Sequence, residues 1–380
     1  MKRIALAAST VLLTLAASAL SQETQTLSAR WLLEVERGEP IENGIVVIKG
    51  DRISAVGRKG EVAAEGEARD LGEATLMPGM IDAHVHLTLA GNPETNARAS
   101  LKAGFTTVQD LGALNYKSIE IRDAIREGKY PGPNVVASGP WLGVSGGTCD
   151  FQGIVIKGAD AFRDRVRKDI AAGADLIKLC ASGWLQQAAE QPEFCEISED
   201  ELRAAIEEAH AAKKRVGVHA MSERAIALSV KHGADLIVHG GFTDKPTIAA
   251  MMTRRVHQLP TLFSLKRSTP QPIYEKLRAH LTAALSEGLP IALGTDAGTF
   301  PHGQNAKEFA ELSAIGMTPA AALRAATIEA AEASGLRGEA GILKAGTRAD
   351  IIAVEGNPLT DLSALQRVKF VMKAGRVIHG

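Results

Sequence analysis

Two kinds of hydrophobic pattern divide the chain. From residue 78 to about 340, short runs rich in valine, isoleucine and leucine alternate with longer stretches whose apolar residues recur at helical spacing. The strand candidates are MIDAHVHL (80–87), TTVQDLG (106–112), NVVASG (134–139), LIKLCASG (176–183), VGVHAMS (216–222), LIVHGG (236–241), HQLPTL (257–262) and IALGTDA (291–297). Eight strand–helix units over roughly 260 residues predict an α/β fold, a (β/α)8 TIM-like barrel.

Helix candidates lie between these strands. AFRDRVRKDIAAG (161–173) and SEDELRAAIEEAHAAK (198–213) have the apolar period of an amphipathic helix. Ser198 and Glu201 form a capping-box pattern, which predicts that the second helix begins there.

The two ends of the chain carry a different pattern. GIVVIKG (44–50) and DRISAVG (51–57) near the start, and ADIIAVEG (349–356) and KFVMKAGRVI (369–378) near the end, are short β-like runs separated by turn residues. We therefore expect residues 20–77 and 341–380 to build one small β-sandwich, with the barrel over residues 78–340.

The first residues differ from both patterns. Lys2 and Arg3 precede an apolar run from Ile4 to about Ala17, and Ser18 and Ala19 follow it. A basic start, a short apolar core and a small-residue cleavage site predict a secretory signal peptide over residues 1–19. The mature protein is then expected in the periplasm or outside the cell, with no membrane anchor after cleavage.

Composition narrows the class of partner. The chain has 43 basic and 44 acidic residues, a formal net charge of −1 and no lysine or arginine block. This balance argues against binding to nucleic acid or to an anionic membrane and leaves a small-molecule substrate, while homo-oligomerisation stays open. Cys149, Cys180 and Cys195 are too few for a disulfide framework or a zinc ribbon, so a Cys149–Cys195 bridge and free thiols remain alternatives.

Polar residues follow several of the predicted strands. In a barrel the carboxyl ends of the strands meet at one rim, where the chemistry of this fold is found. The residues placed there are His84, His86, Lys178, His219, His239 and Asp296. A single strand histidine is usually a packed core residue, but this joint placement at one rim predicts a metal site.

These residues resemble the ligand pattern of the amidohydrolase superfamily, and the resemblance covers nearly all of the chain after the signal peptide. It implies two divalent metal ions, most simply zinc, with a lysine carboxylated by carbon dioxide between them. The implied ligands are His84, His86 and Asp296 on the first metal, His219 and His239 on the second, and Lys178 bridging both. GTDAGTFPHGQNAKEFAEL (294–312), IKLCASG (177–183) and ADIIAVEGNPL (349–359) resemble the branch of metal-dependent dipeptidases and N-acyl-amino-acid hydrolases.

The residue types fit that chemistry. Neutral imidazoles and carboxylates suit divalent zinc, whereas an unmodified lysine ammonium would repel it, so Lys178 is expected as a carbamate. The alternative for Lys178 is a buried lysine paired with a carboxylate. Two bridged metals lower the pKa of a shared water from about 15.7 towards about 7, which makes hydroxide the expected nucleophile. Asp296 is the expected catalytic residue, taking the proton and passing it to the leaving nitrogen.

Further candidates surround this centre. Three residues are candidate substrate contacts: His302 on the loop after strand eight, Cys180 near Lys178, and Trp184. The alternatives are a surface histidine for His302, an inert buried thiol for Cys180 and an indole packed under its loop for Trp184. The strand-three loop reads GGTCD (146–150) where dipeptidase-like relatives tend to have a histidine after the glycine pair. A substrate contact is therefore expected to be absent or replaced.

Several functions remain open. The leading one is hydrolysis of an amide, of a dipeptide or an N-acyl amino acid. The same hydroxide can attack a cyclic amide, a lactone or a phosphotriester, and a non-catalytic metal-binding protein is a third class. Lys178 disfavours a deaminase with one metal. The chain has neither a GxSxG elbow nor a GxGxxG fingerprint, which argues against serine hydrolases and dinucleotide enzymes.

Overall fold

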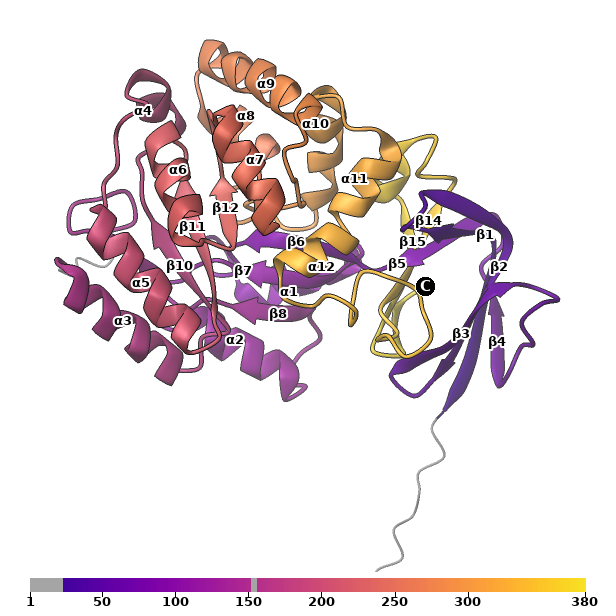
Figure 1. The fold of residues 1–380 in the computed structure, drawn as a ribbon. Helices are drawn as coiled ribbons and strands as arrows, with labels where there is room; N and C mark the ends of the chain where they lie inside the picture. The colour runs from indigo at the N-terminus through magenta and orange to yellow at the C-terminus, as the bar shows by residue number, and fades with distance from the viewer. Residues whose placement is uncertain (1–22, 152–155) are drawn as a thin grey trace, which may run out of the picture.

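The computed structural model describes residues 23–151 and 156–380. The predicted signal peptide, residues 1–19, lies outside the described residues. The chain has an α/β fold in which parallel strands are surrounded by helices (Figure 1). Within the described residues, no helix is both long and apolar enough to cross a membrane.

Two parallel sheets occupy the middle of the chain. One contains β6 (Met80–Val85), β7 (Phe105–Asp110) and β8 (Asn134–Ala137). The other contains β9 (Trp141–Leu142), β10 (Leu176–Cys180), β11 (Arg215–Ala220), β12 (Leu236–His239) and β13 (His257–Leu259). Seven of the eight predicted runs thus contain a strand, and the sequence did not predict the short β9.

The eighth predicted run, residues 291–297, makes isolated bridges in place of a regular ladder. Ile291 bridges to Gln258 of β13, and Ala297 bridges to Val85 of β6, both in parallel. Backbone bonds from Ala83 N to Leu293 O (2.9 Å) and from His86 N to Ala297 O (2.7 Å) hold this segment against β6. It therefore joins the edges of the two sheets.

Helices follow most of these strands and cover their outer faces. In chain order they are α1 (Pro93–Lys102), α2 (Lys117–Arg126), α3 (Ala159–Ala171), α4 (Leu185–Glu190), α5 (Glu199–Ala211), α6 (Glu223–His232), α7 (Lys245–Arg254), α8 (Leu262–Ser268), α9 (Gln271–Ser286), α10 (Glu308–Ala314), α11 (Pro319–Ala325) and α12 (Ile328–Ala333). Both predicted helices are confirmed, as α3 and α5. The capping box is confirmed as well, because Ser198 and Glu201 bond each other's backbone N–H.

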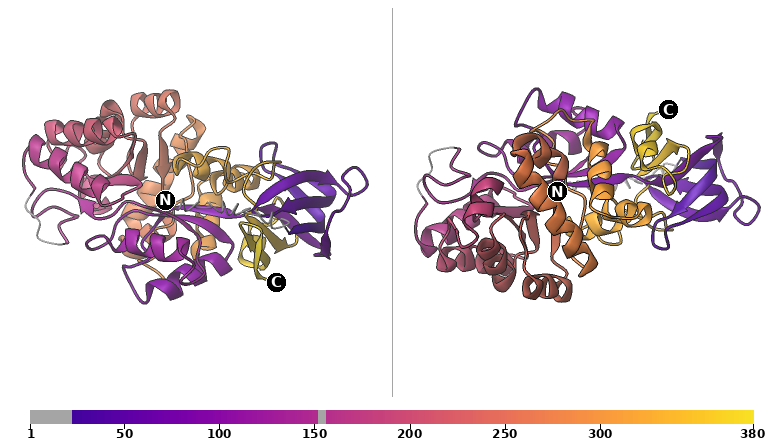
Figure 2. Two further views of the ribbon diagram at one scale, coloured as in Figure 1. Left: turned by 90° about the horizontal axis from the view of Figure 1, so that it is seen from below. Right: turned by 90° about the horizontal axis from the view of Figure 1, so that it is seen from above.

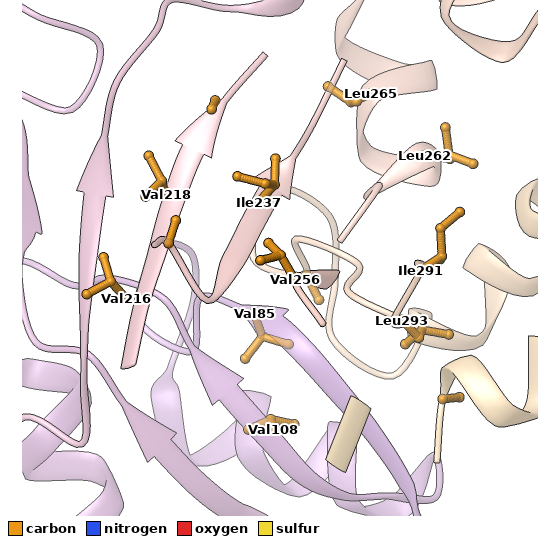
Figure 3. Close-up of a cluster of buried hydrophobic side chains, with 14 of the residues drawn as sticks. Val85, Val108, Val216, Val218, Ile237, Val256, Leu262, Leu265, Ile291 and Leu293 are labelled. Carbon is orange, nitrogen blue, oxygen red and sulfur yellow. The ribbon is translucent and has the colours of Figure 1, made fainter. Parts of the chain in front are cut away.

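A hydrophobic cluster between strands and helices fixes their packing. Its members include Val85, Val108, Val216 and Ile237 from the strands and Leu265 from α8, which Figure 3 shows with their neighbours. A smaller cluster fills the space between the parallel strands, with Ile81, Ala83, Leu176, Leu236, Val238 and Leu259. Burial of this apolar surface holds the polar ends of the strands in place.

The two ends of the chain pair in one sheet of eight strands. These are β1 (Thr24–Glu34), β2 (Glu39–Lys49), β3 (Arg52–Arg58), β4 (Glu67–Asp70), β5 (Ala74–Pro78), β14 (Ile351–Glu355), β15 (Val368–Lys373) and β16 (Arg376–His379). Strand β14 joins the two ends by pairing antiparallel with β5. Figure 2 shows the indigo strands on one side of the molecule, next to the yellow C-terminal segment.

Candidate metal centre

Three of the predicted ligands form a compact cluster at the end of β6. Single donor atoms of His84, His86 and Asp296 all lie within 4.8 Å of one another. The Nε2 atoms of the two histidines are 3.2 Å apart, and they lie 3.4 and 3.3 Å from Asp296 Oδ1. The HxH spacing therefore directs both rings to one point, as the strand period predicts.

The other predicted ligands adjoin this cluster. The ring centroid of His239, at the end of β12, is 5.0 Å from that of His84 and 4.7 Å from that of His219 on β11. Burial lowers the pKa of all three rings, and the charge of buried Lys178 on β10 lowers it further. The structure thus brings all six predicted residues together, while their role as ligands stays a prediction.

Burial keeps most of these imidazoles neutral. It lowers the pKa of His84 and of His239 well below the ordinary value, and that of His219 to about 3, with the charge of Lys178 adding to the effect. Burial also acts on His86, but hydrogen bonding and ion pairing with Asp296 outweigh it and raise its pKa. Neutral imidazole is the form that binds a metal.

The donor set fits divalent metal ions. The Nδ1 atom of His84 and the Nζ atom of Lys178 are buried and have no hydrogen-bond partner among the described residues. Burial lowers the pKa of Lys178 to about 7, so a large fraction of its amine is neutral near neutral pH. Unpartnered buried polar atoms are costly unless another group satisfies them, and metal ions together with a carboxyl group on Lys178 would do so.

Neighbouring groups orient the candidate ligands. His86 Nδ1 lies 2.9 Å from the backbone oxygen of Gly112, and His239 Nδ1 lies 2.8 Å from Thr261 Oγ1. Ser264 donates a hydrogen bond of 3.0 Å to Asp296 Oδ2. Contacts of this kind fix ring orientation and tautomer around a metal.

A cavity of about 550 Å³ opens beside the centre. His239 and Asp296 line it together with Trp184, Met221 and residues of α8. A cavity of about 660 Å³ lies elsewhere, between the terminal sheet and the end of α2. The chemistry of the first cavity's lining makes it the candidate substrate site.

The predicted substrate contacts are placed in different ways. Trp184 lines the cavity, and its ring is 5.4 Å from that of His219. His302 is buried away from the cavity lining, with Nδ1 3.0 Å from Ser100 Oγ and Nε2 3.2 Å from the backbone oxygen of His86. This geometry makes His302 a support for the HxH segment.

Of the cysteine expectations, the free thiol is confirmed for Cys195 alone, and the Cys149–Cys195 bridge is wrong. Cys180 is bonded to Cys149 in a disulfide, so it is not an inert thiol, and the proposed Cys149–Cys195 bridge is absent from the described residues. Cys195 is free, and its Sγ donates to the backbone oxygen of Ile197. The strand-three loop folds back on β10, which linear spacing does not reveal. The correct bridge ties this loop to the strand that carries Lys178.

Sequence reasoning missed several supporting residues. Buried Asp82 accepts hydrogen bonds from Thr295 Oγ1 (2.6 Å) and Asn305 Nδ2 (2.7 Å), which joins β6 to the strand-eight segment. Buried Glu308 accepts from the backbone nitrogens of Leu262 and Phe263 at the start of α8. Asp82 lies two residues before His84 in the sequence, so its closeness to the histidine pair was a signal that could have found it. No local pattern marks Glu308.

The α/β fold and the His/His/Asp cluster are typical of a class of hydrolases that bind metal ions, and comparison with known proteins names the family. The chain belongs to the amidohydrolase family, whose model matches residues 75–378. It is a hydrolase acting on carbon–nitrogen bonds, in a family that typically binds metal ions and acts on small molecules.

Among characterised relatives, ochratoxinase of Aspergillus niger is 29% identical over 409 residues, covering 90% of this chain and 84% of that protein. Its crystal structure superposes with a TM-score of 0.84 at 26% identity, over 94% of this chain and 96% of that one. A Xaa-Pro dipeptidase with methionine bound in its active site gives a TM-score of 0.86 at 28% identity, over 94% and 100%. A prolidase in complex with N-methylphosphonate-L-proline gives 0.82 at 29% identity, over 94% and 99%.

Proposed function

We propose that this protein is a binuclear metal-dependent hydrolase that cleaves the amide bond of a dipeptide or an N-acyl amino acid. The observation that carries the proposal is the convergence of buried histidines and Asp296 around Lys178, whose amine has no partner in the described chain. A buried ammonium with no hydrogen-bond acceptor or counter-ion is unfavourable, and its charge would repel divalent metals. Reaction of the neutral amine of Lys178 with carbon dioxide, with release of a proton, would give an anionic carbamate instead.

The residues divide between two metal positions. His84, His86 and Asp296 would hold the first, His219 and His239 would hold the second, and Lys178 as a carbamate would serve both. The neutral amine of Lys178, favoured by a pKa of about 7, is the form that adds to carbon dioxide. When bound, two zinc ions would lower the pKa of a water and polarise the substrate carbonyl.

The chain's own residues then move the proton and bind the substrate. Asp296 accepts the proton of the attacking water and passes it to the leaving nitrogen, while Ser264 Oγ, 3.0 Å away, keeps the free carboxylate oxygen in position. Trp184 supplies an apolar wall of the cavity. The preference for a dipeptide or N-acyl amino acid is supported by similarity to a Xaa-Pro dipeptidase and to ochratoxinase.

We also propose the finer architecture expected from the sequence. The isolated bridges of residues 291–297 support closure of the parallel strands into one eight-stranded barrel over residues 78–340. A separate buried cluster in the terminal sheet supports a sandwich-like domain of residues 20–77 and 341–380. The Cys149–Cys180 disulfide supports secretion after removal of residues 1–19, because disulfides persist in oxidising compartments.

The test is reconstitution of the mature protein with zinc and bicarbonate, followed by metal analysis and a hydrolysis screen. We expect two zinc ions per chain and release of amino acid from N-acyl amino acids or dipeptides. Lys178→Ala should lose the bound metal, and Asp296→Asn should lose activity by roughly 1,000-fold or more. Full activity of Lys178→Ala, or turnover confined to lactones or phosphotriesters, would contradict the proposal.

A further inference from the structure

One cation lines the substrate cavity without an acidic partner. Arg267 of α8 is exposed to this cavity, and no carboxylate in the described residues forms an ion pair with it. Its guanidinium lies 5.7 Å from the centre of the Phe263 ring, and Lys307 Nζ lies 5.4 Å from the same ring. Phe263 and Lys307 do not themselves line the cavity, whereas Arg267 does, so the unpaired guanidinium of Arg267 makes this edge of the cavity favourable for an anion.

The position of Arg267 relates it to the leaving group of the reaction. Ser264, Arg267 and Ser268 lie on one face of α8, and all three line the cavity. Ser264 donates to Asp296 Oδ2, the carboxylate that we assign to protonation of the leaving nitrogen. Arg267 is thus about one helical turn along α8 from Ser264, which contacts the carboxylate assigned to the leaving amine.

The other side of the cavity is apolar. Trp184 and Leu185 come from the segment after β10, and Met221 comes from the end of β11. Trp184 is 57% exposed, and its ring makes a T-shaped contact with that of His219. An exposed indole at a cavity wall offers apolar contact to a ligand.

We propose that Arg267 binds the carboxylate of the leaving amino acid, while the apolar acyl half of the substrate packs against Trp184. This inference rests on the proposed amide hydrolysis and assigns the direction in which the substrate lies. The carboxylate of an N-acyl amino acid or of a dipeptide's C-terminal residue is separated from the scissile nitrogen by a single carbon. The planar guanidinium can bind it through two parallel hydrogen bonds.

The test compares two substrates that differ only in this charge, N-benzoyl-phenylalanine and N-benzoyl-phenylalaninamide, on the reconstituted enzyme. For the wild type we expect kcat/KM to be about 10- to 100-fold higher on the carboxylate. Arg267→Met should reduce that ratio to near one, because kcat/KM should fall for N-benzoyl-phenylalanine and stay unchanged for the amide. Arg267→Lys should restore part of the ratio. The matched control is Arg278→Met on α9, where the arginine pairs with Glu275 outside the cavity and should not affect the ratio.

A binding measurement separates this inference from the proposed function. Calorimetry with phenylalanine and phenylalaninamide on the reconstituted protein should show tighter binding of the carboxylate, and Arg267→Met should abolish the difference. If the wild type cleaves neither substrate but keeps this binding preference, amide hydrolysis is wrong and the role of Arg267 in anion binding stands. An unchanged rate ratio and an unchanged binding preference in Arg267→Met would overturn the inference while leaving the hydrolase in place.

Discussion

Single residues of the centre adopt a backbone conformation that side chains disfavour. The φ angles of His239, Thr261 and Asp296 are 62°, 48° and 62°, in the left-handed region. Each such residue costs on the order of 1–3 kcal/mol unless its surroundings hold it. Asp296 N donates to the oxygen of His84 (2.7 Å), and Gln258 Nε2 donates to that of His239 (3.2 Å). The chain therefore holds strained backbone where the candidate ligands converge.

Variants of Thr261 test whether a residue that contacts a candidate ligand, His239, affects the zinc affinity of the proposed second metal site. Its hydroxyl is 2.8 Å from His239 Nδ1, so Thr261→Val removes the hydrogen bond but keeps a β-branched side chain at the same strained φ. We expect the affinity for the second zinc to fall by roughly 10- to 100-fold. Chelator competition measures this change. Thr261→Ser keeps the hydroxyl and should bind zinc like the wild type, and equal affinity in the valine variant would exclude the role.

At the scale of elements, α8 connects the substrate cavity to the candidate ligands. Thr261 and Ser264 at its start contact His239 and Asp296, and Arg267 lines the cavity one turn later. Both carboxylate oxygens of Glu308 accept backbone N–H groups of the first turn, at 2.7 and 2.8 Å. A helix start has unpaired N–H groups, so Glu308 determines where α8 begins.

Glu308 also gives stability a dependence on pH. Burial, with repulsion from Asp82 and Glu311, raises its pKa from 4.5 to about 8 despite the backbone bonds that oppose the shift. Between these values Glu308 holds a proton in the folded state that it has lost in the unfolded state, so the contribution of Glu308 to the free energy of unfolding falls as pH rises from about 4.5 to about 8. Glu308→Gln should show a flatter dependence in urea titrations across this range. Parallel curves for variant and wild type would show that Glu308 does not titrate there.

The disulfide gives a prediction for the strand-three loop. Cys149 and Cys180 are 31 residues apart in the sequence. Their bridge should stabilise the fold by about 3–4 kcal/mol, because it lowers the conformational entropy of the unfolded chain. Reduction, or replacement of both residues by serine, should lower the unfolding free energy by this amount in guanidinium titrations. Cys195→Ser serves as the control and should have little effect, because that thiol is free. A loss equal to that of the control would show that the bridge adds no stability.

The sequence predicted seven of the parallel strands, α3 and α5, because hydrophobic period and capping are local properties. It placed His84, His86, Lys178, His219 and Asp296 at one rim because parallel strands share a direction. It did not predict the partner of Cys149 or the contacts of Glu308 with α8, since both depend on how distant loops fold back. His302 shows the same limit: its loop position suggested substrate contact, whereas its ring is buried against Ser100 and His86.

At the scale of the whole molecule, one strand connects two hydrophobic cores. On β14, Ile351 and Ala353 belong to the cluster inside the terminal sheet. Ile352 and Val354 belong to the main cluster around the parallel strands. The period of two of a strand thus places alternate residues in different cores. Strand β5, which pairs with β14, leads directly into β6 and its histidines.

This shared strand predicts that both parts of the molecule unfold together. Ile351→Val and Ile352→Val each remove one buried methylene, and each should lower the unfolding free energy by about 1 kcal/mol. Because the cores are coupled through β14, calorimetry should show a single transition that both variants shift alike. Neither residue lines the cavity, so kcat/KM should be unchanged below the transition. If Ile351→Val shifted one of two separate transitions, the terminal sheet would be an independently folding unit and the coupling through β14 would be too weak to join the cores.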